Sequence, residues 1–124
     1  MKLGAPKKIF IVDDDEMLTE ALSDFLTRDI NHNISVFNTG EDFLGHISEN
    51  PDIVILDFYL NTVNKDAANG LEILEAISKH VHNTRVIMLS SQESYITAAK
   101  TIQKGAVQYI IKDENAFQKI ADSI

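Results

Sequence analysis

The segment IVILD, residues 53–57, is an unbroken apolar run that ends on a carboxylate. Such a run is typical of a short strand that is buried on both faces of a parallel sheet. Three further runs have the same form and lead into polar side chains: 9–12 before Asp13, Asp14 and Asp15, 86–89 before Ser90, and 109–111 before Lys112. Ligands of open α/β sheets bind beyond the carboxyl ends of the strands, so we expect these side chains to share one site.

Between the runs, apolar residues recur at helical spacing, which predicts alternating strands and helices around a parallel sheet. The predicted elements are strands over 9–12, 34–37, 53–56, 86–89 and 109–111 and helices over about 15–28, 43–47, 71–77, 95–102 and 117–124. Pro51 closes the short second helix, and Gly105 suits the left-handed cap that ends many helices. The fifth helix is expected to run to the last residue.

Two of the predicted helices are identified by an apolar stripe with three- and four-residue spacing. The stripes comprise Met17, Leu18, Ala21, Leu22, Phe25 and Leu26 in the first helix and Tyr95, Ile96, Ala99 and Ile102 in the fourth. Asp15 stands at the start of the first helix, where a carboxylate commonly caps the backbone and suits the positive end of the helix dipole. We therefore interpret Asp15 as a helix cap.

The length of 124 residues fits one domain with a real core. We expect residues 1–124 to form a single unit, with about 1–6 as a flexible N-terminal segment. Hydrophobic residues make up 44% and charged residues 24% of the chain, as in an ordinary soluble domain, so disorder is not expected beyond the ends.

A formal charge of −8 disfavours nucleic acid as a partner, because such binding relies on Lys and Arg to neutralise phosphates. Proteins or cations are the expected partners. The apolar runs are far shorter than the roughly 20 residues that span a bilayer, and the start of the chain lacks a signal-peptide segment. We therefore expect no membrane association and a cytoplasmic location.

The chain has no cysteine, which excludes disulfides, thiolate nucleophiles and cysteine-bound zinc. A bound metal must then use oxygen or imidazole ligands. The spacing of His32, His46, His80 and His82 is not that of a metal site, and we expect all four at the surface. Carboxylates are the remaining candidate ligands.

Three of the candidate carboxylates, Asp13, Asp14 and Asp57, would repel one another strongly at close range, so they require a cation or raised pKa values. Mg²⁺ is the simplest solution, since it takes one or two carboxylates and accepts a phosphate oxygen. Lys112 and Ser90 supply an ammonium and a hydroxyl for the other phosphate oxygens. Asp57 is the natural nucleophile, because carboxylates form aspartyl-phosphate intermediates.

At these residues the chain resembles the receiver domain of two-component response regulators over nearly its whole length. The acid pair of that family falls on Asp13 and Asp14, its phosphorylated aspartate on Asp57, its hydroxyl on Ser90 and its lysine on Lys112. The resemblance implies a flavodoxin-like fold: a doubly wound, five-stranded parallel sheet of order 2-1-3-4-5 with five helices. It also implies self-catalysed phosphorylation and slow autodephosphorylation.

The same resemblance implies a phosphoryl donor, which is a phosphohistidine on a sensor histidine kinase or histidine phosphotransfer protein. Mg²⁺ would be bound by Asp13, Asp14, Asp57 and the backbone carbonyl of Tyr59. The side chain of Tyr59, together with Gln92, would tune dephosphorylation.

The resemblance further implies a switch in which Ser90 moves toward the phosphoryl group and Tyr109 rotates inward. These movements would reshape the face formed by the helix over 95–102, the strand over 109–111 and the helix over 117–124. That face would dock an output domain, an effector protein or a second copy in a homodimer.

Two features depart from the family pattern. Asp113 follows Lys112 where the family usually has a proline in a cis peptide, so the turn after the fifth strand is expected to differ in shape. The stretch 61–70 is longer than usual and has Asn61 in place of a proline. Polar and Asn-rich, it is expected to be a loop over the site.

Two other functions fit parts of the pattern. A pseudo-receiver would keep the site without being phosphorylated and would act only as an interaction module. A small Mg²⁺-dependent phosphohydrolase is suggested by Asp13 and Asp15, which stand where haloacid-dehalogenase-like enzymes place a nucleophile and an acid. That reading gives Asp57 no central role, and the chain lacks room for a substrate cap.

Overall fold

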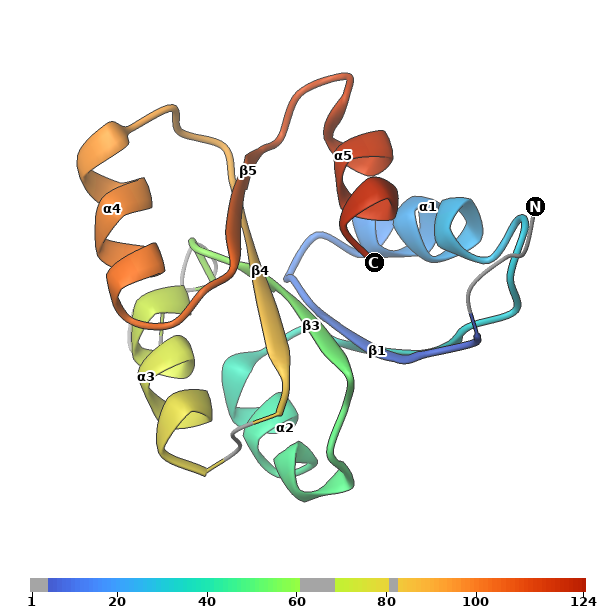
Figure 1. Cartoon of the computed structure of the whole chain (residues 1–124), viewed down its shortest axis with the longest axis horizontal. Helices are drawn as coiled ribbons and strands as arrows, with labels where there is room; N and C mark the ends of the chain where they lie inside the picture. Colours follow the sequence, from blue (N-terminus) through green and yellow to red (C-terminus); the bar gives the residue numbers. More distant parts are fainter. Residues whose placement is uncertain (1–4, 61–68, 81–82) are drawn as a thin grey trace.

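A five-stranded parallel sheet forms the centre of the chain, in the order β2-β1-β3-β4-β5 (Figure 1). The computed structural model describes residues 5–60, 69–80 and 83–124. The strands are β1 (Lys8–Val12), β2 (Asn33–Phe37), β3 (Ile53–Asp57), β4 (Arg85–Ser90) and β5 (Gln108–Ile111). The strand order reverses between β1 and β3, which places a topological switch point at their carboxyl ends. The predicted fold class is confirmed.

Helices cover both faces of the sheet (Figure 1). They are α1 (Glu16–Leu26), α2 (Gly40–Leu44), α3 (Gly70–His80), α4 (Tyr95–Gln103) and α5 (Ala116–Ser123), with a 3₁₀ turn η1 (Ile47–Glu49). α1 and α5 lie on one side, and α2, α3 and α4 lie on the other. The short helix predicted over 43–47 is divided into α2 and η1, because Gly45, a poor helix former, ends α2. α5 ends at Ser123, with Ile124 as its C-cap.

Alternate residues of the central strands face opposite layers, which explains the unbroken apolar runs. Phe10 and Val12 join the core under α2 and α3, whereas Ile9 and Ile11 join the core under α1 and α5. All four are fully buried. Each contributes about 1.5–3 kcal/mol by leaving water.

Side-chain caps start four of the helices at the carboxyl edge of the sheet, including α3, where Asn69 Oδ1 accepts from the Glu72 N–H at 3.0 Å. Asp15 caps α1, as predicted, by accepting from the Leu18 N–H at 3.1 Å. Thr39 caps α2 and Ser94 caps α4 in the same way. Gly105 follows α4 with a φ of 115°, the positive φ expected of it. The caps fix where each chain segment leaves this edge.

The apolar residues that identify α4 in the sequence are not the residues that it buries. Tyr95 is 87% exposed and Ile96 is 72% exposed, whereas Thr101 is fully buried. Thr101 lies five residues after Ile96, about 140° around the helix, so the apolar stripe points away from the sheet. Met17 of α1 is likewise 84% exposed, because it lies at the same angle from the buried Leu22.

The prediction that every histidine lies at the surface is wrong for His32. This side chain is only 9% exposed, and its Nδ1 accepts from the Lys7 N–H at 2.9 Å. The contact links the start of β2 to the residue before β1, so the ring has a structural partner. Burial lowers the pKa of His32, which keeps the ring neutral. His46 and His80 are exposed as expected, and His82 lies outside the described residues.

Candidate functional site

The structure brings Asp13, Asp57, Ser90 and Lys112 to the carboxyl edge of neighbouring strands, as the sequence predicts. Backbone hydrogen bonds hold the strand ends together: the Phe58 N–H donates to Leu89 O at 2.9 Å, and the Lys112 N–H donates to Ser90 O at 2.7 Å. The edge is therefore a set of backbone positions tied to one another rather than a group of free loops.

Asp13, Asp14 and Asp57 converge at this edge, with candidate ligand oxygens that all lie within 4.8 Å of one another. Asp13 and Asp57 are almost fully buried, at 1% and 3% exposed. Asp13 Oδ1 accepts from the Asp15 N–H at 2.9 Å, and Asp57 Oδ1 accepts from the Tyr59 N–H at 3.2 Å. The backbone thus aims two carboxylates into one small volume.

Lys112 lies between the two buried carboxylates. Its Nζ is 3.1 Å from Asp13 Oδ2 and 3.3 Å from Asp57 Oδ1. Burial lowers the pKa of Lys112, but the attraction of Asp57 and Asp13 outweighs burial and the net pKa is raised. Lys112 is therefore a permanent cation at neutral pH.

Burial is also the main influence on the carboxylates. It raises the pKa of Asp57 to about 6, with repulsion from Asp13 as a second cause and the charge of Lys112 acting in the opposite direction. Burial raises the pKa of Asp13 as well. One ammonium does not balance the two buried carboxylates of Asp13 and Asp57, so the cluster has an affinity for further positive charge.

The donor set fits a divalent cation with oxygen ligands. Asp13 Oδ2 is buried, and it faces Lys112 without the geometry of a hydrogen bond, so it lacks a hydrogen-bond partner. A buried carboxylate oxygen that forms no hydrogen bond is costly, and its ion pair with Lys112 leaves room for a further cation ligand. Mg²⁺ favours such all-oxygen sites and keeps several waters. The carboxylates of Asp13, Asp14 and Asp57 would hold the ion.

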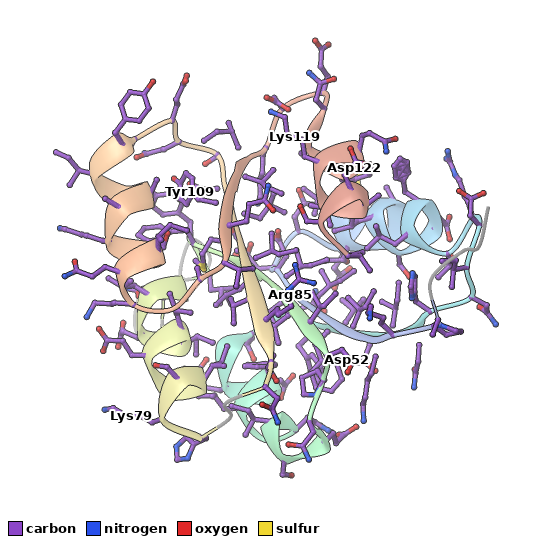
Figure 2. All side chains as sticks on the ribbon, viewed as in Figure 1. Asp52, Lys79, Arg85, Tyr109, Lys119 and Asp122 are labelled. Carbon is purple, nitrogen blue, oxygen red and sulfur yellow. The ribbon has the colours of Figure 1, made fainter. Side chains whose placement is uncertain are left out.

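Ser90 is fully buried at the end of β4, and its Oγ accepts from the Gln92 N–H at 3.1 Å. Ser91, by contrast, is exposed. Tyr109 is a half-buried residue of β5 whose side chain lies on the side of α4 (Figure 2). Its hydroxyl donates to Gln92 O at 2.8 Å. The β4–α4 loop is therefore tied both to the Ser90 hydroxyl and to the Tyr109 ring.

Two residues of the site were missed by the sequence reasoning. Asn38 Nδ2 donates to Asp13 O at 3.0 Å and so holds the backbone of the acidic pair. The available signal was its place directly after the second predicted strand. Gly70 packs against the end of β3, where an added Cβ would lie 2.5 Å from Asp57 O. No sequence pattern reveals so close an approach.

The peptide between Lys112 and Asp113 is trans, since no described residue has a cis peptide bond. The turn after β5 thus differs from the cis-proline turn of the family pattern, in line with the sequence. The long stretch 61–70 is described only at Asn69 and Gly70, and the predicted loop over the site falls mostly outside the described residues.

This fold and this edge define a class: doubly wound α/β domains that carry an acidic pocket with a lysine at the switch point. The chain belongs to the response regulator receiver domain family, whose family model matches residues 9–124. Receiver domains bind Mg²⁺ at an acidic pocket, which here corresponds to the cluster of Asp13, Asp14 and Asp57. They interact with histidine kinases and output domains.

Curated relatives include the transcriptional regulatory protein CpxR of Escherichia coli (strain K12), 32% identical over 114 residues that cover 92% of this chain and 46% of CpxR. The probable C4-dicarboxylate response regulator DctR of Bacillus subtilis (strain 168) is 34% identical over 107 residues, 85% of this chain and 45% of DctR. The chain thus spans about half the length of these relatives.

Solved structures show the same fold. The BeF3-activated DrrB receiver domain matches with a TM-score of 0.81 at 30% identity, over 95% of this chain and 94% of that one. DrrB of Thermotoga maritima, an OmpR/PhoB homologue, matches with a TM-score of 0.80 at 28% identity, over 94% of this chain and 50% of that one.

None of the helices within the described ranges is long and apolar enough to span a membrane.

Proposed function

We propose that Asp57 accepts a phosphoryl group from a phosphohistidine of a sensor histidine kinase or a histidine phosphotransfer protein. The observation that carries this proposal is the buried Asp57 carboxylate, which lies beside Asp13 and 3.3 Å from the Lys112 ammonium. We also propose that residues 1–124 form a single domain and that the protein is located in the cytoplasm.

In the proposed reaction an oxygen of Asp57 attacks phosphorus in line, the P–N bond to the donor histidine breaks, and its electron pair returns to the imidazole. Asp57 must be ionised to attack, and a pKa of about 6 leaves most of it ionised at pH 7. Lys112 offsets the charge on the transferred oxygens, and Ser90 offers a hydroxyl donor. Mg²⁺, held also by the backbone carbonyl of Tyr59, would supply further charge neutralisation.

The proposed consequence is a switch. Ser90 turns toward the phosphoryl group, and Tyr109 follows into the space that it leaves. Moving an ensemble from 1:99 to 99:1 takes about 5.5 kcal/mol. The responding face comprises α4, β5 and α5, where Tyr95, Ile96 and Val107 are exposed. An output domain, an effector protein or a second copy would dock there. Tyr59 and Gln92 are proposed to set the rate of hydrolysis.

The test is intact mass spectrometry after incubation with Mg²⁺ and acetyl phosphate. We expect the wild type to gain one phosphoryl group, and we expect no gain in Asp57→Asn or with a chelator present. If the wild type binds Mg²⁺ but gains no phosphoryl group from acetyl phosphate or from a phosphohistidine donor, the pseudo-receiver reading replaces this proposal.

The phosphohydrolase reading has less support. Asp15, which would be its acid, uses its side chain to cap α1 and is not among the clustered carboxylates. Turnover of a generic phosphate ester that survives in Asp57→Asn would favour it.

A further inference from the structure

Asp113, directly after Lys112, forms a compact hydrogen-bonded turn between β5 and α5. Its N–H donates to Ile111 O at 2.8 Å, and its carbonyl accepts from the Ala116 N–H at 3.1 Å. Its side-chain Oδ1 accepts from the Asn115 N–H at 2.8 Å. All three of its hydrogen-bonding groups are therefore used within one short turn.

The side chain of Asp113 is hydrogen-bonded to the backbone of the residue that stands at the N-cap position of α5. Asn115, the residue at the N-cap position, forms no side-chain cap hydrogen bond. A carboxylate that accepts from a backbone N–H at this end of a helix also suits the positive end of the helix dipole. Lys119 of α5, labelled in Figure 2, has its Nζ 3.8 Å from Asp113 Oδ2, in an exposed pair of little energetic weight. The hydrogen bond from the Asn115 N–H, rather than the pair, fixes the turn.

This turn determines where the Lys112 side chain begins. On one side, the Lys112 N–H donates to Ser90 O, and on the other the Asp113 turn closes back onto Ile111. The Lys112 ammonium must reach both Asp13 and Asp57 through a flexible four-carbon chain, so its reach depends on the backbone from which it starts. The Asp113 carboxylate contacts the Asn115 N–H and the Lys119 ammonium. It therefore acts on Lys112 through the backbone of the turn.

We infer that Asp113 is a positioning residue for Lys112: its turn holds the lysine backbone so that the ammonium meets Asp57 and the incoming phosphoryl group. The inference rests on the proposed phosphorylation of Asp57. Misplacement of a catalytic group by about 1 Å can cost up to a hundredfold in rate. Loss of the Asp113 side-chain acceptor should therefore lower the rate of phosphoryl transfer and leave the affinity for the metal unchanged.

Four variants separate this role from others. Asp113→Ala removes the side-chain acceptor, and Asp113→Asn removes the charge but keeps an acceptor oxygen. Lys119→Met removes only the exposed ion pair. Thr39→Ala is the structural control, because it removes a side-chain oxygen that accepts from a backbone N–H (that of Asp42, at 3.1 Å) at the start of another helix, α2, beyond the edge strand β2.

The measurement is the rate of phosphorylation by acetyl phosphate over a range of Mg²⁺ concentrations, with thermal unfolding of each variant alongside. We expect Asp113→Ala to lower the maximal rate about tenfold with an unchanged half-saturating Mg²⁺ concentration. Asp113→Asn, Lys119→Met and Thr39→Ala should stay within about twofold of the wild type.

The two ways of failing are distinct. If the wild type itself takes up no phosphoryl group, the proposed function fails. If the wild type is phosphorylated and Asp113→Ala reacts at the wild-type rate, only the positioning role is overturned. A slow Asp113→Asn with a wild-type Lys119→Met would also overturn it, since the charge rather than the turn would then matter.

Discussion

At the scale of single residues, burial is the largest influence on the pKa of Asp57. Desolvation raises the pKa of this carboxyl from 3.8 to about 6, against the attraction of Lys112. The folded protein therefore holds this proton more tightly than the unfolded chain does. The linked stabilisation is fully present below pH 4, and it is lost as the pH rises through 6.

We predict that Asp57→Asn is more stable than the wild type above pH 6 in metal-free buffer, by about 1–3 kcal/mol. The reason is that the amide removes a buried charge from a cluster with excess negative charge. Denaturant unfolding at several values between pH 4 and 8, in the presence of a chelator, measures the effect. The difference in the free energy of unfolding between variant and wild type should increase as the pH rises from 4 through 6. A difference that is constant over pH 4 to 8 would contradict the raised pKa of Asp57 as its cause.

At the scale of elements, the contact between α3 and β3 is set by Gly70. Its N–H donates to Phe58 O at 2.9 Å, and an added Cβ would lie 2.6 Å from the Phe58 Cα. Phe58 O and Phe58 Cα are backbone atoms, so they cannot rotate out of contact as the end of a side chain could. The helix starts this close to Asp57 only because the residue has no side chain.

We predict that Gly70→Ala lowers the free energy of unfolding by about 2 kcal/mol, because α3 must shift away from the end of β3. Gly45→Ala is the matched control, since its Cβ would meet its nearest atom, Asp42 O, at an ordinary 3.4 Å. Chemical denaturation of both variants checks the difference. Equal stability of Gly70→Ala and Gly45→Ala would show that the helix can move without cost.

The sequence predicted the elements well, but it did not show which face of α4 is buried. Strand runs are identified by burial on both faces, which leaves a strong local pattern around residues such as Ile55. The apolar residues of α4 do not show which face is buried, because their spacing is the same whether they cover a core or lie on an exposed surface. Thr101, the residue of α4 that is buried, carries no hydrophobic signal. Tertiary packing alone decides that choice.

At the scale of the whole molecule, the sheet topology collects negative charge at one end of a chain whose net charge is already −8. The sequence predicted this gathering, because the order of strands fixes which chain segments meet. It could not predict that Lys112 would contact both Asp13 and Asp57, since that depends on the turn at Asp113. Nor could it reveal that Asn38, directly after the edge strand β2, donates a hydrogen bond to the backbone of Asp13.

We predict that Mg²⁺ stabilises the whole domain by offsetting this charge, by about 2.7 kcal/mol at a hundredfold excess over its Kd. Thermal unfolding with increasing MgCl₂, against NaCl of equal ionic strength, measures the effect. Asp13→Asn should lose most of the Mg²⁺-specific shift. An equal shift with NaCl would mean that general screening, rather than the carboxylate cluster, is responsible.

The hydrogen bond from the Lys7 N–H to His32 Nδ1 leaves the ring proton on Nε2, because the neutral imidazole has one donor and one acceptor nitrogen. His32 thereby becomes a spectroscopic probe of the amino end of the sheet, with a defined tautomer visible in nitrogen-15 NMR spectra. Its two ring resonances would report whether chemistry at the opposite end of the strands is transmitted through β1 and β2 or stops at the carboxyl edge.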